Sequence, residues 1–380
     1  MSIFSFDRAL FERYPYYSPR SWFVVLIAAL FFFFEFIQMN MFNAIAPGLI
    51  KSFSLSASDL GNLSASYFYG NVAFLIPAGI LLDRVSTKKL LTAAISVCVV
   101  CTYLFAISTT QWEAVVFRFI TGMGASFCML SAVRLASRWF PPQRIALIIG
   151  LVVTMAMAGG MLAQTPLAYL SHWLGWRHAV MINAILGLVF TVIIFIFVQD
   201  YPASIAAQQQ KERQVLKETG FLSSIALAFK NRQNWFAGIY TNFLSFPVVI
   251  LGAAWGSLYL MHVRHLTHLQ TTNITQMIFL GMIFGSPIMG LISDKLQRRK
   301  LPMIVGAVLT LIVILWIMLP TNLSVSELLW LFFFLGFLSG TQVITYPLIV
   351  ESNPREITTT AEGLTCFLIM SAGLFQFIFG

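Results

Sequence analysis

Eleven apolar runs, each long enough to cross a lipid bilayer as a helix, dominate the sequence. A helix needs about 20 mostly apolar residues to span the hydrocarbon core. Runs of this length lie at approximately 21–49, 58–82, 89–108, 113–136, 145–170, 178–198, 235–261, 270–293, 301–319, 327–350 and 357–379. Only 10% of the 380 residues are charged, whereas about a quarter are charged in an ordinary soluble domain. The sequence therefore predicts an all-α membrane protein whose outer surface is covered mostly by lipid.

The basic residues predict how these helices are oriented. Of the 23 Lys and Arg residues, eighteen lie in predicted connections on one side, and three lie on the other side, at Lys51, Arg177 and Arg264. Since Lys and Arg collect in cytoplasmic loops, the N-terminus is expected in the cytoplasm. The same rule explains the net charge of +9 without a nucleic-acid partner.

The sequence also contains an internal repeat. A shift of 211 residues superposes Asn62 on Asn273, Gly79 on Gly290 and Asp83 on Asp294. This predicts two pseudo-symmetric six-helix bundles, 1–198 and 235–380, joined by a polar cytoplasmic linker, 199–234. The repeat calls for a twelfth span beyond the last residue, Gly380. We therefore expect a C-terminal truncation, and an authentic eleven-helix form is the other interpretation.

Two related loops follow the second and the eighth predicted spans. They contain Gly79, Asp83, Arg84, Lys88 and Lys89, and then Gly290, Asp294, Lys295, Arg298 and Arg299. The glycines permit close helix contact, and the aspartates can cap or pair with neighbouring helix ends. We predict a charge-based latch between the bundles that breaks as they rock. A merely topogenic basic loop would explain the Lys and Arg residues but not the repeated Gly and Asp.

This repeated loop resembles the loop signature of the major facilitator superfamily. The segment 117–125, around Arg118, is similar to the superfamily's second signature, whose buried Arg is associated with proton coupling. The resemblance covers the whole chain. It implies a secondary transporter of the bacterial inner membrane, not an enzyme, that works by alternating access and is coupled to protons.

Shorter stretches resemble one branch of that superfamily. The fifth span lacks the Gly-Pro pairing characteristic of drug/proton antiporters, and with 64–71 and 139–142 it looks like the phagosomal-transporter branch of intracellular Gram-negative bacteria. That resemblance implies import of an amino acid first and a nucleoside next. Multidrug efflux, or a sensor or scaffold that kept the fold without transport, are the alternatives.

Charged residues at membrane depth are costly and usually functional. Glu35 lies near the middle of the first span, where it could carry the coupling proton or bind a substrate ammonium. A structural ion pair, with Arg118 as a partner, is the alternative. Arg118 itself lies near the outer interface, so it serves in proton coupling or substrate binding, or else it anchors the helix at that interface. For Glu362 we expect pairing with Arg355 or Arg134.

Uncharged polar residues complete the predicted cavity. They are Gln38, Asn43, Tyr67, Asn71, Gln164, Tyr240, Asn242, Ser245, Gln342, Tyr346 and Thr365. Each is either a substrate contact or a hydrogen bond between helices, and together they suit a zwitterion or a nucleoside. No catalytic group, cofactor or metal site is predicted. The expected partners are a small-molecule substrate, the proton and the lipid bilayer, and we expect a monomer.

Overall fold

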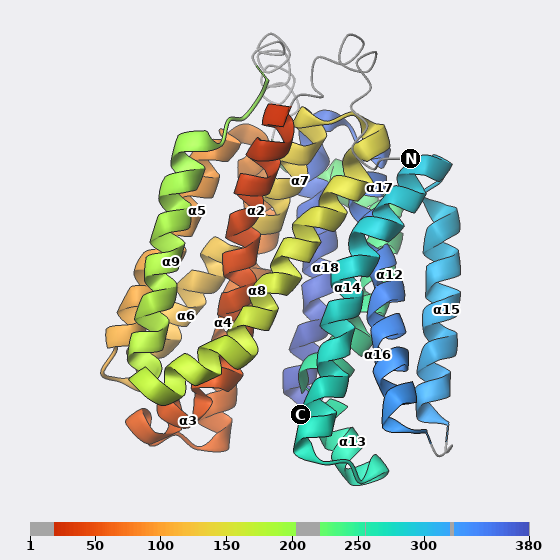
Figure 1. Cartoon of the computed structure of the whole chain (residues 1–380). Coiled ribbons are helices and arrows are strands. Elements are labelled where there is room, and N and C mark those ends of the chain that lie inside the picture. Colours follow the sequence, from red (N-terminus) through yellow and green to blue (C-terminus); the bar gives the residue numbers. More distant parts are fainter. Residues whose placement is uncertain (1–18, 203–220, 255, 320–322, 380) are drawn as a thin grey trace.

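The computed structural model describes residues 19–202, 221–254, 256–319 and 323–379, and this part of the chain is almost entirely helical (Figure 1). Ten helical stretches are long and apolar enough to cross a bilayer, and they coincide with the first ten predicted spans. They are Pro19–Asn40, Ser58–Arg84, Thr87–Ile107, Gln111–Trp139, Pro142–Leu174, Trp176–Phe197, Arg232–Gly252, Gln270–Leu296, Lys300–Met318 and Val325–Ser352. The eleventh prediction corresponds to α18 (Thr358–Phe379). The predicted all-α membrane fold is confirmed.

The helices form two sets on either side of the molecule. The first comprises α2 (Pro19–Asn40), α3 (Phe42–Phe53), α4 (Ala57–Arg84), α5 (Thr87–Ile107), α6 (Gln111–Ala125), α7 (Phe127–Trp139), α8 (Ile145–Leu174) and α9 (Trp176–Phe197). The second comprises α12 (Arg232–Pro247), α13 (Gly256–Arg264), α14 (His268–Leu296), α15 (Lys300–Met318), α16 (Val325–Ser339), α17 (Thr345–Ser352) and α18. Of the predicted linker, residues 203–220 lie outside the described residues, and α11 (Phe221–Lys230) packs against α18.

The repeat is visible in how equivalent helices begin. Ser56 caps α4 in a reciprocal capping box with Asp59. Thr267 caps α14 in the same arrangement with Gln270. Such boxes satisfy two free backbone N–H groups at a helix start. The two caps are 211 residues apart, as the repeat predicts.

Four predicted spans are not continuous helices, and this corrects the sequence prediction. The first is interrupted between α2 and α3, and the fourth bends at Ser126, whose hydroxyl donates to the Met123 carbonyl at 2.7 Å. The seventh passes through a π-helix, Val248–Ala254, directly after Pro247. The tenth passes through a 3-10 segment, Gly340–Ile344. The interruptions therefore fall in the first and fourth spans of each half. Irregular backbone at membrane depth is tolerated only where protein or a water-filled cavity surrounds it.

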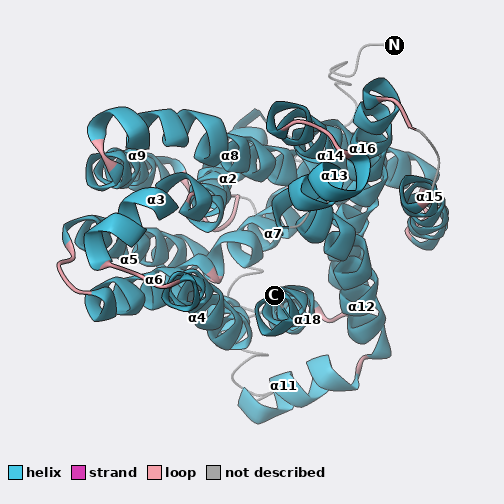
Figure 2. Cartoon of the chain, turned by 90° about the horizontal axis from the view of Figure 1, so that it is seen from below, coloured by secondary structure: helices cyan, strands magenta, loops and turns pink. Residues whose placement is uncertain are grey.

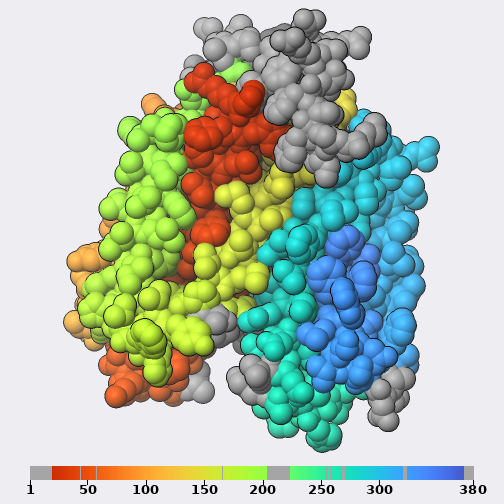
Figure 3. Space-filling view, viewed as in Figure 1, coloured from red at the N-terminus to blue at the C-terminus, as the bar shows by residue number. Residues whose placement is uncertain are grey.

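The two halves meet at one end and separate toward the other. We call the first the basic end, because the loops with Lys88, Lys89, Lys295 and Arg298 lie there. The largest contacts between the halves are those of α4 with α18 and of α8 with α14. The end-on view shows the same neighbours (Figure 2). The space-filling view shows a gap between the halves at the opposite end, where α3 and α13 lie (Figure 3).

Candidate functional site

Glu35 is buried on α2 without a cation beside it. Its side chain accepts a hydrogen bond of 2.9 Å from the Tyr67 hydroxyl of α4 and one of 3.4 Å from the Cys128 thiol of α7. Among the described residues, no ion pair includes Glu35. The alternative of an ion pair with Arg118 is therefore not what the structure shows. Both charged residues instead contact Tyr67, Glu35 at its hydroxyl and Arg118 at its ring.

Arg118 lies inside a cage of aromatic rings. Its guanidinium carbon is 4.7 Å from the ring centre of Tyr67, 5.7 Å from that of Phe42 and 5.9 Å from that of Phe105. Nη1 donates to the Gln38 carbonyl at 3.1 Å, and Nε is buried without a hydrogen-bond partner. Only 1% of the residue is exposed, so it does not reach out to the interface as an anchor would.

A close helix crossing brings these groups together. A Cβ at Gly122 on α6 would lie 2.0 Å from the Tyr67 carbonyl oxygen of α4, so only glycine allows the two backbones to approach this closely. Asn71, one turn along α4, donates to the Gly122 carbonyl at 3.4 Å. The crossing thus fixes Tyr67 between the guanidinium of Arg118 and the carboxyl of Glu35.

The remaining polar residues of the first half are distributed around this cluster. Gln38 is buried and donates from Nε2 to the Thr102 hydroxyl at 2.7 Å, while its Oε1 has no hydrogen-bond partner. Gln164 is half-buried on α8. The side chain of Asn43 lies outside the described residues.

In the second half, the polar residues gather at the interruption between α16 and α17. Ser245 donates to Gln342 Oε1 at 2.6 Å, and the Tyr240 hydroxyl lies 2.9 Å from that of Thr341. Both Ser245 and Gln342 are half-buried. These groups join α12 to the 3-10 segment and are the ones placed nearest to the irregular backbone.

Three other predicted cavity residues join helices to one another. Asn242 donates to the Leu368 carbonyl at 2.7 Å. Thr365 is fully buried and donates to the Ala361 and Asn234 carbonyls. The Tyr346 hydroxyl pairs with the Cys366 thiol. Since hydrogen bonds between helices occupy these groups, the structure favours the packing alternative for them.

A first inter-half cluster surrounds Asp83 at the basic end. Its carboxylate accepts hydrogen bonds from the backbone N–H groups of Thr359 and Thr360 at 3.2 and 2.8 Å, and thereby caps the start of α18 in the other half. The Thr360 hydroxyl donates to it at 2.6 Å. Arg134 of α7 forms an ion pair with the same carboxylate and donates to the Thr359 hydroxyl at 2.6 Å. A negative charge at a helix N-terminus is stabilising.

A second inter-half cluster surrounds Asp294. Its carboxylate accepts a 2.9 Å hydrogen bond from the Leu147 N–H near the start of α8, again in the other half. Arg299 donates to Asp294 at 2.6 Å, to Glu351 at 2.7 Å and to the Pro142 carbonyl at 2.8 Å. Burial works against its charge, but the carboxylates of Glu351 and Asp294 hold the pKa of Arg299 above its ordinary value.

The glycines of the two predicted loops, which the structure places on α4 and α14, allow both contacts. A Cβ at Gly79 would lie 2.4 Å from the Thr359 carbonyl oxygen, and one at Gly290 would lie 2.3 Å from that of Ala146. The obstructing atoms are backbone and cannot rotate away. Glycine at both positions is therefore required for the halves to touch at the basic end.

The other loop residues lie around these clusters. Arg84 donates to the Ser224 hydroxyl of α11 at 3.4 Å. The backbone N–H groups of Lys88 and Lys89 donate to Asp200 and Ser86. Lys295 and Arg298 are exposed.

Several contributors were not predicted as site residues. Arg134 could have been suspected, because it and Arg118 are the arginines that fall within the predicted spans. Thr359, Thr360 and Cys128 give no signal, because their role depends on contacts across long sequence separations.

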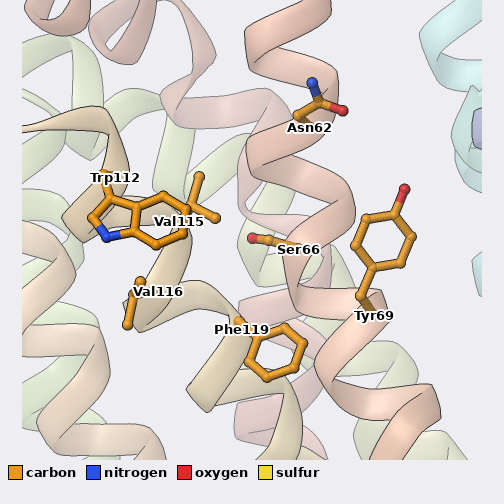
Figure 4. Close-up of a pocket in the computed structure, with 7 residues that line it drawn as sticks. All are labelled: Asn62, Ser66, Tyr69, Trp112, Val115, Val116 and Phe119. Carbon is orange, nitrogen blue, oxygen red and sulfur yellow. The ribbon is translucent and has the colours of Figure 1, made fainter.

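A pocket of about 380 Å³ lies apart from this site, between α4 and α6 (Figure 4). Its lining is mostly apolar, and none of the predicted site residues belongs to it. It is formed by Asn62, Ser66, Tyr69, Trp112, Val115, Val116 and Phe119.

Removing the cation of the first cluster is expected to destabilise the protein. In Arg134→Ala, Asp83 stays buried without its partner, which costs about 3–5 kcal/mol for a buried pair, so the thermal unfolding midpoint in detergent should fall clearly. The double variant Asp83→Asn/Arg134→Met removes both charges and should lose less. If Arg134→Ala has the same thermal unfolding midpoint as the wild type, the ion pair between Asp83 and Arg134 contributes no stability.

The fold and these clusters define a class of protein. It is a helical membrane protein of two repeated halves, each half has interrupted helices at equivalent positions, and the halves touch at one end. Residues 28–376 match the family model of the Major Facilitator Superfamily, and the chain belongs to this family.

Three relatives illustrate the range of the family. The chain is 23% identical to the hexuronate transporter of Bacillus subtilis, over 73% of this chain and 65% of that protein. It is 28% identical to the 4-hydroxybenzoate transporter PcaK of Pseudomonas aeruginosa, over 47% of this chain and 40% of that protein. It is 24% identical to the membrane sensor protein UhpC of Salmonella typhimurium, over 96% of this chain and 84% of that protein. The chain thus spans less than two thirds of the first two relatives.

Among solved structures, the proton:xylose symporter XylE has the same fold. The TM-score is 0.72 at 16% identity, over 93% of this chain and 86% of that chain. The names of these proteins do not support the phagosomal branch, which stays a prediction.

Proposed function

We propose that this protein is a proton-coupled secondary transporter that imports a small polar metabolite by alternating access. The observation that carries the proposal is Glu35, a buried carboxyl at membrane depth that is hydrogen-bonded to Tyr67 and Cys128 with no ion pair among the described residues. Such a group can bind and release a proton or hold a substrate cation. Family membership supports transport as the activity.

We assign the basic end to the cytoplasm, because Lys and Arg collect on that side of a membrane. The structure then represents the outward-facing state. The two inter-half clusters are the latches that hold the cytoplasmic end closed, and they must open for substrate to leave.

The substrate that we propose is a small metabolite with a carboxylate. Amino acids, predicted first from the sequence, belong to this class. Hexuronate and 4-hydroxybenzoate, which appear in the names of two relatives, both carry a carboxylate. The guanidinium of Arg118 is the complementary group, because its planar fork matches a carboxylate. A nucleoside, the second prediction, lacks the carboxylate.

Transport assays in vesicles test this function. Thermal-shift screening of the purified protein against amino acids, organic acids and nucleosides selects a ligand. Reconstituted protein should then accumulate that ligand when the interior is alkaline, and a protonophore should abolish accumulation. Vesicles without protein are the control.

A sensor is the second candidate, favoured by the match to UhpC over nearly the whole chain. Counterflow distinguishes the two, because only a carrier exchanges labelled for unlabelled substrate. A ligand that stabilises the protein but shows neither counterflow nor uptake would exclude the transporter and support the sensor.

A further inference from the structure

Glu362 on α18 is a fully buried carboxyl without a hydrogen-bond partner. Its exposure is 0%, and neither Oε1 nor Oε2 has a partner. In the described part of the chain, no other carboxyl is buried with both oxygens unsatisfied. The expected pairing with Arg134 or Arg355 is not formed, because Arg134 is paired with Asp83 and no described ion pair includes Arg355.

Asp83 of α4 and Arg134 of α7 are the charges that act on Glu362. Arg134 is already paired with Asp83, and its buried Nε makes no hydrogen bond to Glu362. Tyr346 of α17 and Cys366, one turn further along α18, are the other ionisable groups beside it. The neighbouring Ala361 belongs to an apolar cluster with Ala228 of α11, Ala237 of α12 and Ile349 of α17.

The two inter-half clusters differ in where their extra carboxyl lies. In the second, Arg299 binds both Asp294 and Glu351, and the Glu351 side chain is 34% exposed. In the first, Asp83 is the only carboxylate that pairs with Arg134 among the described residues, and Glu362 is fully buried where α4 contacts α18. A second negative charge in that closed interface would be uncompensated, which costs several kcal/mol per buried ion. A neutral carboxyl would not carry this cost.

We propose that Glu362 is a proton-binding site of the first inter-half cluster, protonated while α4 and α18 touch and ionised when they separate. On separation the carboxyl O–H bond breaks, the electron pair stays on the oxygen, and the proton passes to water entering the interface. Because the closed interface holds the proton more tightly, acid stabilises the closed state and a rising pH favours opening. The inference extends the proposed proton-coupled function by naming a second proton site.

Two measurements on the protein in detergent or vesicles test it. Spin labels at Val85 and Arg355, which are exposed on either side of the contact, report the separation of α4 from α18. The native cysteines are buried. The distance between the labels should lengthen as the pH rises from about 5 to about 8, a range that begins above the ordinary pKa of a glutamate side chain. In Glu362→Gln this distance should stay short over the whole pH range. Infrared spectra should show a protonated carboxyl band at acid pH that Glu362→Gln removes.

Two further variants complete the experiment. Glu362→Asp keeps an ionisable group and should retain a pH response. Glu327→Gln alters an exposed carboxyl in the cap of α16 and should behave as wild type.

A label distance that still depends on pH in Glu362→Gln, or an infrared band that this variant does not change, overturns the proposal. If Glu362→Gln does not fold, loss of the pH response in Glu362→Asp, or no protonated carboxyl band in the wild type, overturns it instead. A wild type that shows the pH response but transports no solute contradicts the transporter and leaves the proton site standing.

Discussion

Glu35→Gln is expected to lose uptake driven by a proton gradient while keeping substrate exchange. The amide cannot release a proton, but it can still accept the hydrogen bond from Tyr67 and keeps the size of the side chain. We expect gradient-driven uptake to fall by about 100-fold, equivalent to about 2.7 kcal/mol. Counterflow, which needs no net proton movement, should continue. Uptake is measured in vesicles with an alkaline interior.

Two conservative variants serve as comparisons for Glu35→Gln. Tyr67→Phe deletes one hydrogen bond to Glu35 but keeps the ring against Arg118, and Cys128→Ser keeps a donor. Both should retain coupled uptake at a reduced rate. Coupled uptake by Glu35→Gln at the wild-type level would remove Glu35 from proton coupling.

Gly79→Ala is expected to prevent closure of the basic end. The added Cβ would lie 2.4 Å from the Thr359 carbonyl oxygen and 3.1 Å from the Thr360 Cα, and neither can move without shifting α18. Overpacking of this kind costs about 1–3 kcal/mol, which acts against the closed state alone. Uptake should fall to the level of protein-free vesicles, and spin labels on α4 and α18 should move apart.

The same helix offers a matched control for Gly79→Ala. A Cβ at Gly61 would meet no atom within 4 Å, so Gly61→Ala should transport normally. Gly290→Ala, where the Cβ would lie 2.3 Å from the Ala146 carbonyl oxygen, should reproduce the defect at the second cluster. Normal transport by Gly79→Ala would mean that the two helices do not need this contact.

The sequence predicts the spans and the repeat well, because both follow from patterns that lipid imposes locally. It does not predict where a span is interrupted. The π-helix after Pro247 and the bend at Ser126 lie within apolar runs that read as continuous. A run of apolar residues shows that a segment is buried in lipid but not whether its backbone hydrogen bonds are regular.

The sequence indicates which residues belong to the candidate site, but it does not indicate which residues they contact. Glu35 and Arg118 stand out as charges at membrane depth, but their common contact with Tyr67 depends on the crossing at Gly122. Asp83 belongs to a recognisable sequence motif, yet the N–H groups that it binds lie more than 270 residues away. Glu362 was expected to be paired because a cation lies nearby, and the structure shows that this cation is already occupied by Asp83.

The three ion pairs of the described residues all lie at the basic end, and both buried aspartates cap helices of the opposite half. Each of these contacts stabilises the arrangement in which this side is shut. A cargo that bound both arrangements equally well would leave that preference unchanged. Reversing an occupancy of 1:99 requires about 5.5 kcal/mol of differential binding. A cargo that reverses such a preference must therefore bind the arrangement with this side open more tightly by an amount of this order, while a proton on Glu362 favours the closed one.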